Sequence, residues 1–389
     1  MIFVGFFEAI TINKDWLGVM LMQTVGVELG LLNLPKNKTF LVTVLSFISF
    51  VAVTNLFGVN SMTTTIFLLI VSIVLLISSV DFFIDGAKGL ARKLGIAEVI
   101  IGLTIVSVGT SLPEILVTSA SAIDSATNPG AADLAFGSIF GSILSQITLI
   151  LGIVVMTTSV KVHPNWFKRD GMLMLACLIL VGIMSMTESG LTRTEGAILV
   201  LIYLGYVYYL LSNRNKLAED EGGDSNIQEA ITWSSVSYSM MLILGLYFAL
   251  FSAQKLVELA SELALAANVP HAIIGTTVSG IGTSLPELTI AIMAAKKSEG
   301  VAIGTLIGSN ITDPTLSIGL AALIAPMTMT GPGVDMLMYL IFPSTVVGVL
   351  VALVFMRTDY EFKKWEGGVL IAVYGVFLVL MEMYRRGLF

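Results

Sequence analysis

VIIGLTIVSVGTSLPE at residues 99–114 returns as AIIGTTVSGIGTSLPE at residues 272–287, and ten of the sixteen positions are identical. Each copy ends in a glutamate, Glu114 or Glu287, inside an apolar stretch. A carboxylate within a bilayer costs at least ~2.5 kcal/mol, so an intramembrane acid is by default a hypothesis for a functional site. Two such acids in repeated surroundings indicate a cation site.

The composition predicts a membrane protein. Of the 389 residues, 56% are hydrophobic and 12% are charged, and the mean hydropathy is +0.93. Nearly every apolar run reaches the ~20 residues with which a helix spans a bilayer, which predicts an all-α, polytopic protein of the cell membrane. The net charge of −7 provides no basic surface for a nucleic acid. A single cysteine, Cys177, excludes a disulfide framework within the chain.

The apolar runs predict eleven membrane helices, near 39–60, 64–93, 97–122, 131–156, 171–188, 193–212, 232–264, 271–295, 299–325, 334–356 and 367–384. A repeat unit of five helices begins at the second of these and is followed by five more. Because five is odd, the second copy enters the membrane upside down. Two inverted repeats are the architecture of many secondary transporters. Lysine and arginine concentrate in alternate connections, which the positive-inside rule assigns to the cytoplasm.

The predicted organisation has four parts. Residues 1–62 form an N-terminal extension with at least one helix, and residues 63–213 form the first repeat. Residues 214–231 are a polar cytoplasmic linker, and residues 232–389 are the second, inverted repeat. Within the extension, residues 16–34 are long enough to span the membrane but include Glu28. Both an additional span and an interfacial helix remain open for them.

Four segments share one spacing of oxygen-bearing side chains. The pairs are Thr110 with Glu114, Thr283 with Glu287, Ser142 with Gln146, and Ser309 with Asp313. Residues four apart share a helix face, so each pair can direct two oxygens toward one point. Oxygen ligands suit hard cations such as calcium or sodium, whereas zinc and copper prefer nitrogen and sulfur. Pro113 and Pro286 would free backbone carbonyls beside the acids.

These motifs resemble a known family. GTSLPE twice, FGSIFGS followed by Gln146, and IGTLIGSNITD are similar to the paired alpha repeats of the cation/calcium antiporter superfamily, especially its prokaryotic sodium/calcium exchangers. The resemblance covers roughly residues 65–385. It implies an integral membrane transporter and not an enzyme, with calcium and sodium as transported ions, no cofactor and no obligate protein partner.

The resemblance also implies roles for individual residues. Glu114 and Glu287 would be the central carboxylates shared by calcium and sodium, and Asp313 matches the acidic end of the second repeat. The other implied ligands carry oxygens on hydroxyls, backbone carbonyls or an amide: Thr110, Thr283, Ser111, Ser284, Ser142, Ser309 and Gln146. Gln146 stands where the family more often has asparagine, so its longer reach puts ion selectivity in question. The family adds that the helices near 64–93 and 232–264 slide against the remaining bundle.

Three functions remain open at the level of sequence. The first is a calcium antiporter driven by sodium, in which one load must replace another because three acids repel one another. The nearest alternative is a proton-driven cation exchanger, although proton-coupled relatives tend to carry histidine beside the repeat acid, where this chain has leucine or isoleucine. The third is a passive calcium channel.

Two packing features are also predicted from the sequence. The GxxxG steps Gly137 to Gly141 and Gly304 to Gly308 should allow helices to approach closely. Asp81 and Asp85 face one side of their helix and could guide cations, but a packing role or an ion pair of Asp85 with Lys88 is favoured.

Overall fold

The computed structural model describes residues 38–57, 61–128, 130–158, 160–187, 189–220, 234–266 and 285–388. Several predictions lie outside the described residues. They are the possible span at 16–34, most of the linker 214–231, and the first part of the helix 271–295, including Thr283 and Ser284.

The described residues form an all-α bundle, as the sequence predicts. Its helices are α3 (Lys38–Phe57), α4 (Met62–Leu94), α5 (Glu98–Ile101), α6 (Ser107–Thr110), α7 (Leu112–Asp124), α8 (Gly130–Leu144), α9 (Leu151–Thr157), α10 (Pro164–Trp166), α11 (Met172–Thr187), α12 (Arg193–Ser212), α13 (Arg214–Asp220), α14 (Ser235–Ala266), α17 (Leu285–Lys297), α18 (Glu299–Thr312), α19 (Ile318–Ile324), α20 (Gly331–Met336), α21 (Phe342–Arg357) and α22 (Lys364–Arg385). Wider π-helical turns join some of them: η1 (Gly102–Val106), η2 (Ser145–Ile150), η3 (Phe167–Gly171), η5 (Asp313–Ser317) and η6 (Leu337–Ile341).

When helices joined by a π-type turn are taken together, seven described stretches are long and apolar enough to cross a membrane. The bent pair formed by Glu98–Thr110 and Leu112–Asp124 raises this to eight. The protein is therefore a multi-pass integral membrane protein. The stretch from Glu299 to Ile324 is continuous helix but does not reach the apolarity of the seven. It contains Asn310 and Asp313, both fully buried, so its polar side chains face protein.

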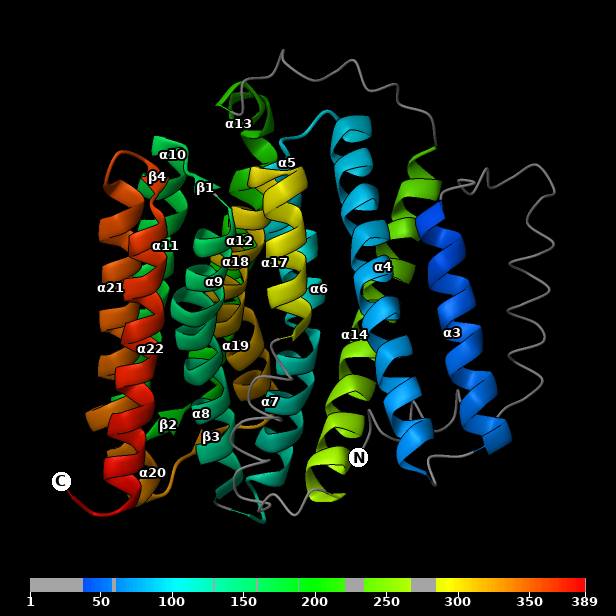
Figure 1. The fold of residues 1–389 in the computed structure, drawn as a ribbon. Coiled ribbons are helices and arrows are strands. Elements are labelled where there is room, and N and C mark those ends of the chain that lie inside the picture. Colours follow the sequence, from blue (N-terminus) through cyan, green and yellow to red (C-terminus); the bar gives the residue numbers. More distant parts are fainter. Residues whose placement is uncertain are drawn as a thin grey trace.

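Two short strand pairs join the halves of the chain. Strand β1 (Val160–Lys161) pairs antiparallel with β4 (Glu361–Phe362), and β2 (Gly190–Leu191) pairs antiparallel with β3 (Met327–Thr328). Each pair takes one strand from each half, and the pairs lie at opposite ends of the bundle (Figure 1). The elements α10, α13, β1 and β4 lie at one end, and they contain or adjoin basic connections that the positive-inside rule assigns to the cytoplasm.

Helices α4 and α14 pack along each other at one side of the bundle, and α3 packs against α4 (Figure 1). Glycines allow the close approach, because a Cβ at Gly245 would lie 2.8 Å from the Cα of Phe83. The ring centroid of Phe47 on α3 lies 4.9 Å from that of Phe248 and 5.3 Å from that of Phe251, and both of these residues are on α14. Helix α3 is thus attached to the α4–α14 pair.

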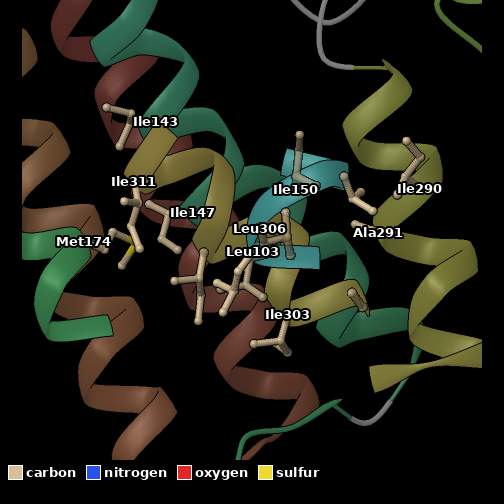
Figure 2. Packing of buried hydrophobic residues seen from close by; sticks show 14 of the residues in the cluster. Leu103, Ile143, Ile147, Ile150, Met174, Ile290, Ala291, Ile303, Leu306 and Ile311 are labelled. Carbon is tan, nitrogen blue, oxygen red and sulfur yellow. The ribbon is translucent and has the colours of Figure 1, made fainter. Parts of the chain in front are cut away.

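At the centre of the molecule, helix α18 crosses η1, and glycines on α18 allow the two backbones to approach closely. A Cβ at Gly304 would lie 2.7 Å from the carbonyl oxygen of Val99, and one at Gly308 would lie 2.8 Å from the Cα of Leu103. Close packing at Gly304 and Gly308 is therefore confirmed. Figure 2 shows apolar side chains on both sides of this crossing, among them Leu103, Ile303 and Leu306.

The corresponding prediction for Gly137 and Gly141 has no support among the described residues, where no atom lies within 4 Å of a Cβ built at either position. The order of the two repeats makes residues 272–284 the counterpart of the chain that packs on Gly304 and Gly308. Those residues lie outside the described part of the chain.

An ionic contact joins α4 to the end of α17. Lys297 Nζ lies 2.5 Å from Asp81 Oδ1 and 2.9 Å from Asp85 Oδ1, and Lys88 Nζ donates to the backbone carbonyl of Lys297 at 2.9 Å. The prediction that Asp85 pairs with Lys88 is therefore wrong. The lysine from the second half replaces the one on the same helix because α17 ends beside α4.

The crossing of α18 over η1 gives a first prediction. Gly304→Ala would place a methyl group against a backbone oxygen and should lower the free energy of unfolding by ~1–3 kcal/mol. Gly375→Ala on α22, where no described atom lies within 4 Å, is the matched control and should not be destabilising. Thermal unfolding of both purified variants in detergent measures the difference. Equal melting points for the two variants would contradict the packing argument.

Candidate cation site

The two repeat glutamates stand at the beginnings of helices. The chain bends by 47° between α6 and α7, and Pro113 occupies the first turn of α7 together with Glu114. Glu287 similarly lies in the first turn of α17. The backbone N–H groups of a first turn have no partner within the helix, and the helix dipole favours negative charge there. This placement offsets part of the cost of burying two carboxylates.

Asp313 and Gln146 stand at corresponding wide turns. Asp313 begins η5, and Gln146 lies at the second position of η2. Gln146 Nε2 donates to Ser142 Oγ at 2.9 Å and approaches Asp313 Oδ2 at 3.5 Å. The predicted pairing of Ser142 with Gln146 on one helix face is confirmed. Turns of the π type displace backbone groups and occur frequently at functional sites.

The three acids come together in the interior. Glu114 is 8% exposed, Glu287 is 2% exposed and Asp313 is fully buried. The carboxylate of Glu114 is close enough to those of Glu287 and Asp313 for their charges to interact, and so is Glu287 to Asp313. Glu114 and Glu287 lie in different halves of the chain. The structure thus gathers acids from both halves around one region.

Several buried oxygens in this region lack hydrogen-bond partners among the described residues. They are Glu114 Oε2, Glu287 Oε2, Gln146 Oε1 and Ser111 Oγ. A buried polar atom without a partner costs ~1–3 kcal/mol, so these four oxygens are candidate ligands for a cation. Because Gln146 donates through its nitrogen, the atom that it leaves free is a carbonyl-type oxygen, which is a ligand for hard cations.

Hydroxyl pairs connect the two halves beside the acids. Thr110 Oγ1 lies 3.2 Å from Ser309 Oγ, and Ser107 Oγ lies 2.6 Å from Thr312 Oγ1. All four residues are buried. Thr110 and Ser309 are predicted from the sequence, whereas Ser107 and Thr312 are not. Their spacing is the signal that could have found them, because Ser107 precedes Thr110 by one helical turn and Thr312 follows Ser309 by one.

The oxygen set fits a hard cation better than a transition metal. Within the described ranges, no group of three or more acidic, histidine or cysteine side chains is arranged to hold a metal ion by itself. Hydroxyl, amide and backbone oxygens are further ligand types that calcium accepts. Thr283 and Ser284 belong to the predicted set but lie outside the described residues.

Comparison with known proteins places these features in a family. The sequence model described as "Sodium/calcium exchanger protein" matches residues 64–212 and again residues 237–382. The chain belongs to the sodium/calcium exchanger family. Both matches of the exchanger model begin inside one of the long helices, α4 and α14, and each contains one of the repeat glutamates.

Individual relatives are similar over most of the chain. Sodium/calcium exchanger MaX1 of Methanosarcina acetivorans is 30% identical over 354 residues, covering 82% of this chain and 99% of that protein. Inner membrane protein YrbG of Escherichia coli is 32% identical, over 67% of this chain and 79% of YrbG. A solved structure of the sodium-calcium exchanger NCX_Mj aligns with a TM-score of 0.66 at 26% identity, covering 81% of this chain and 98% of NCX_Mj.

A second branch of exchangers is also related. Vacuolar cation/proton exchanger 3 of Oryza sativa is 25% identical over 268 residues, covering 61% of this chain and 63% of that protein. MaX1, NCX_Mj and the vacuolar protein of Oryza sativa are named as exchangers of cations, which agrees with the predicted class of transporter.

Repulsion among the buried acids leads to a second prediction. Glu114→Gln keeps the side-chain shape but removes one of three interacting charges, so the cation-free variant should melt at a higher temperature than the unaltered protein. The same variant should lose the stabilisation by calcium, which is ~2.7 kcal/mol for a ligand at 100 times its Kd. Melting curves with chelator and with calcium measure both effects. A variant that melts lower without cations but still responds to calcium would contradict this interpretation.

Proposed function

We propose that this protein is a secondary active antiporter that exchanges calcium for sodium by alternating access at a carboxylate site near the membrane midplane. The observation that carries the proposal is the convergence of Glu114, Glu287 and Asp313 from the two halves of the chain, with unpartnered oxygens on both glutamates. Membership of the sodium/calcium exchanger family supports the choice of ions.

The proposed ligands are those that the sequence suggests. Glu114 and Glu287 hold the ions at the centre, and Asp313 and Gln146 complete the site between the two wide turns. Hydroxyl or backbone oxygens come from Thr110, Thr283, Ser111, Ser284, Ser142 and Ser309. One calcium ion or several sodium ions offset similar negative charge, so the two loads compete for the same oxygens. An empty site leaves like charges opposed in a low dielectric, which disfavours movement without a load and makes exchange favourable over leak.

The proposed domain organisation follows from the same duplication. We assign residues 63–213 and 232–389 to the two inverted repeats, residues 214–231 to the cytoplasmic linker and residues 1–62 to the extension. The double match of the family model and the two strand pairs at opposite ends support this division. The α4–α14 pair is the proposed moving part, because it packs mainly on itself and on α3 at one side of the bundle.

Transport in vesicles tests this proposal directly. Protein reconstituted into liposomes loaded with sodium should take up calcium when external sodium is removed, and a proton uncoupler should not prevent the uptake. Glu287→Gln removes a central charge and should reduce uptake at least ~100-fold, since a buried charged ligand contributes several kcal/mol. Isothermal titration with calcium and sodium checks that the loss lies in binding. Calcium uptake that needs no counter-gradient would indicate a channel and contradict the proposal.

A proton-driven cation exchanger is the second candidate. Similarity to a vacuolar cation/proton exchanger and the burial of three acids favour it. In the same vesicles it would give calcium uptake driven by an outward proton gradient without sodium, abolished by the uncoupler. Calcium uptake and its sensitivity to the uncoupler, measured with and without sodium, therefore separate the two candidates.

Gln146 gives a prediction about affinity. Gln146→Leu retains the bulk but removes the free amide oxygen and the donor to Asp313, which should raise the calcium KM by roughly 10-fold. Gln146→Asn shortens the side chain by one methylene and should change the ratio of sodium to calcium affinity. Ser185→Ala on α11, a buried serine that donates only within its own helix, serves as the control. Unchanged KM values in Gln146→Leu would exclude the amide from the site.

A further inference from the structure

A buried bridge connects helix α7 of the first half with η5 of the second. Thr118 is fully buried, and its hydroxyl donates to the carbonyl of Glu114 at 2.7 Å. The same hydroxyl lies 3.2 Å from the carbonyl of Ile115 and 3.3 Å from the carbonyl of Ser317. Ser317, also fully buried, donates its own hydroxyl to Asp313 Oδ1 at 3.4 Å. Two neutral residues thus link the backbone at one acid with the carboxylate of another.

The bridge exists on one side of the site only. Thr118 follows Glu114 by four residues, and the residue in the same place after Glu287 is Ala291. Ser317 follows Asp313 by four, and the residue in the same place after Gln146 is Ile150. Helix α17 contacts η2, and both Ala291 and Ile150 belong to the central apolar cluster (Figure 2). The contact between α17 and η2 is therefore apolar at these positions. The duplication alone does not explain why Thr118 and Ser317 have hydroxyls at the corresponding positions of α7 and η5.

The local geometry explains how such a bridge can form. A threonine that bonds the carbonyl four residues back bends its helix slightly and keeps its hydroxyl close to the helix surface. Ser317 is the N-cap of α19, and a backbone carbonyl has two lone pairs, so its oxygen can accept from Thr118 as well as from the helix. This contact relates the position of η5 to that of α7.

We propose that Thr118 and Ser317 are positioning residues that hold Glu114 and Asp313 at the separation at which both bind one cation. The inference rests on the proposed function. Calcium ligands lie within 2.3–2.6 Å of the ion, so a small displacement between the two acids weakens binding. Neither residue contacts the ion in this assignment. A role in packing alone would be preserved by an isosteric apolar side chain, which separates the two possibilities.

Thr118→Val tests the proposal because valine keeps the shape and removes the hydroxyl. Loss of one hydrogen bond should raise the calcium KM in vesicles and the calcium Kd by about 3- to 10-fold, with little change in Vmax. Thr118→Ser should restore most of the affinity. Ser317→Ala, which removes the donor to Asp313, should raise KM in the same direction.

Thr305→Val on α18 is the matched control. Thr305 is fully buried, and its hydroxyl donates only to the carbonyl of Val301 on the same helix, at 2.7 Å. It should leave KM unchanged while showing what loss of a buried threonine hydroxyl does to the melting temperature. This inference alone would be overturned if Thr118→Val had the same calcium KM as Thr305→Val. It would also be overturned if Thr118→Ser did not restore the calcium affinity. Absence of calcium binding by the unaltered protein would overturn the proposed function and this inference with it.

Discussion

The repulsion among three acids within an apolar bundle is the constraint on which the rest of this structure depends. Desolvating a carboxylate is costly, and placing a second and third nearby adds to the cost. The chain meets this cost with features that regular helices lack: glutamates in the first turns of α7 and α17, wide turns at Asp313 and Gln146, and donors from neutral side chains. Binding of a cation or of protons at the acids would remove the remaining repulsion.

Holding the acids together requires the two halves to interlock. At the centre, α18 approaches η1 so closely that a methyl group at Gly304 would meet backbone atoms. At the two ends, β1 with β4 and β2 with β3 link helices that are far apart in the sequence. The frame built in this way is fixed at three levels, and the acids lie within it. The α4–α14 pair has no such strand link among the described residues.

Much of this arrangement was predictable because the duplication repeats chemistry as well as shape. The helix boundaries, the close packing at Gly304 and the pairing of Ser142 with Gln146 follow from periodicity and spacing along single helices. Contacts between helices were harder to predict. Asp85 pairs with Lys297 and not with Lys88, because tertiary packing brings the end of α17 beside α4. The contact of Thr118 with Ser317 was missed for the same reason, since the two residues lie 199 positions apart.

The attachment of α3 has a consequence for any displacement of the α4–α14 pair. Its phenylalanines pack on α14, and its length follows α4, so a rigid shift of the pair carries α3 with it. Helix α3 lies beyond both segments matched by the family. The travelling body would then have three helices, and it would have to push aside a wider ring of lipid than a pair alone. If the pair moves as proposed above, the drag of the surrounding lipid on three helices would be one determinant of the turnover rate.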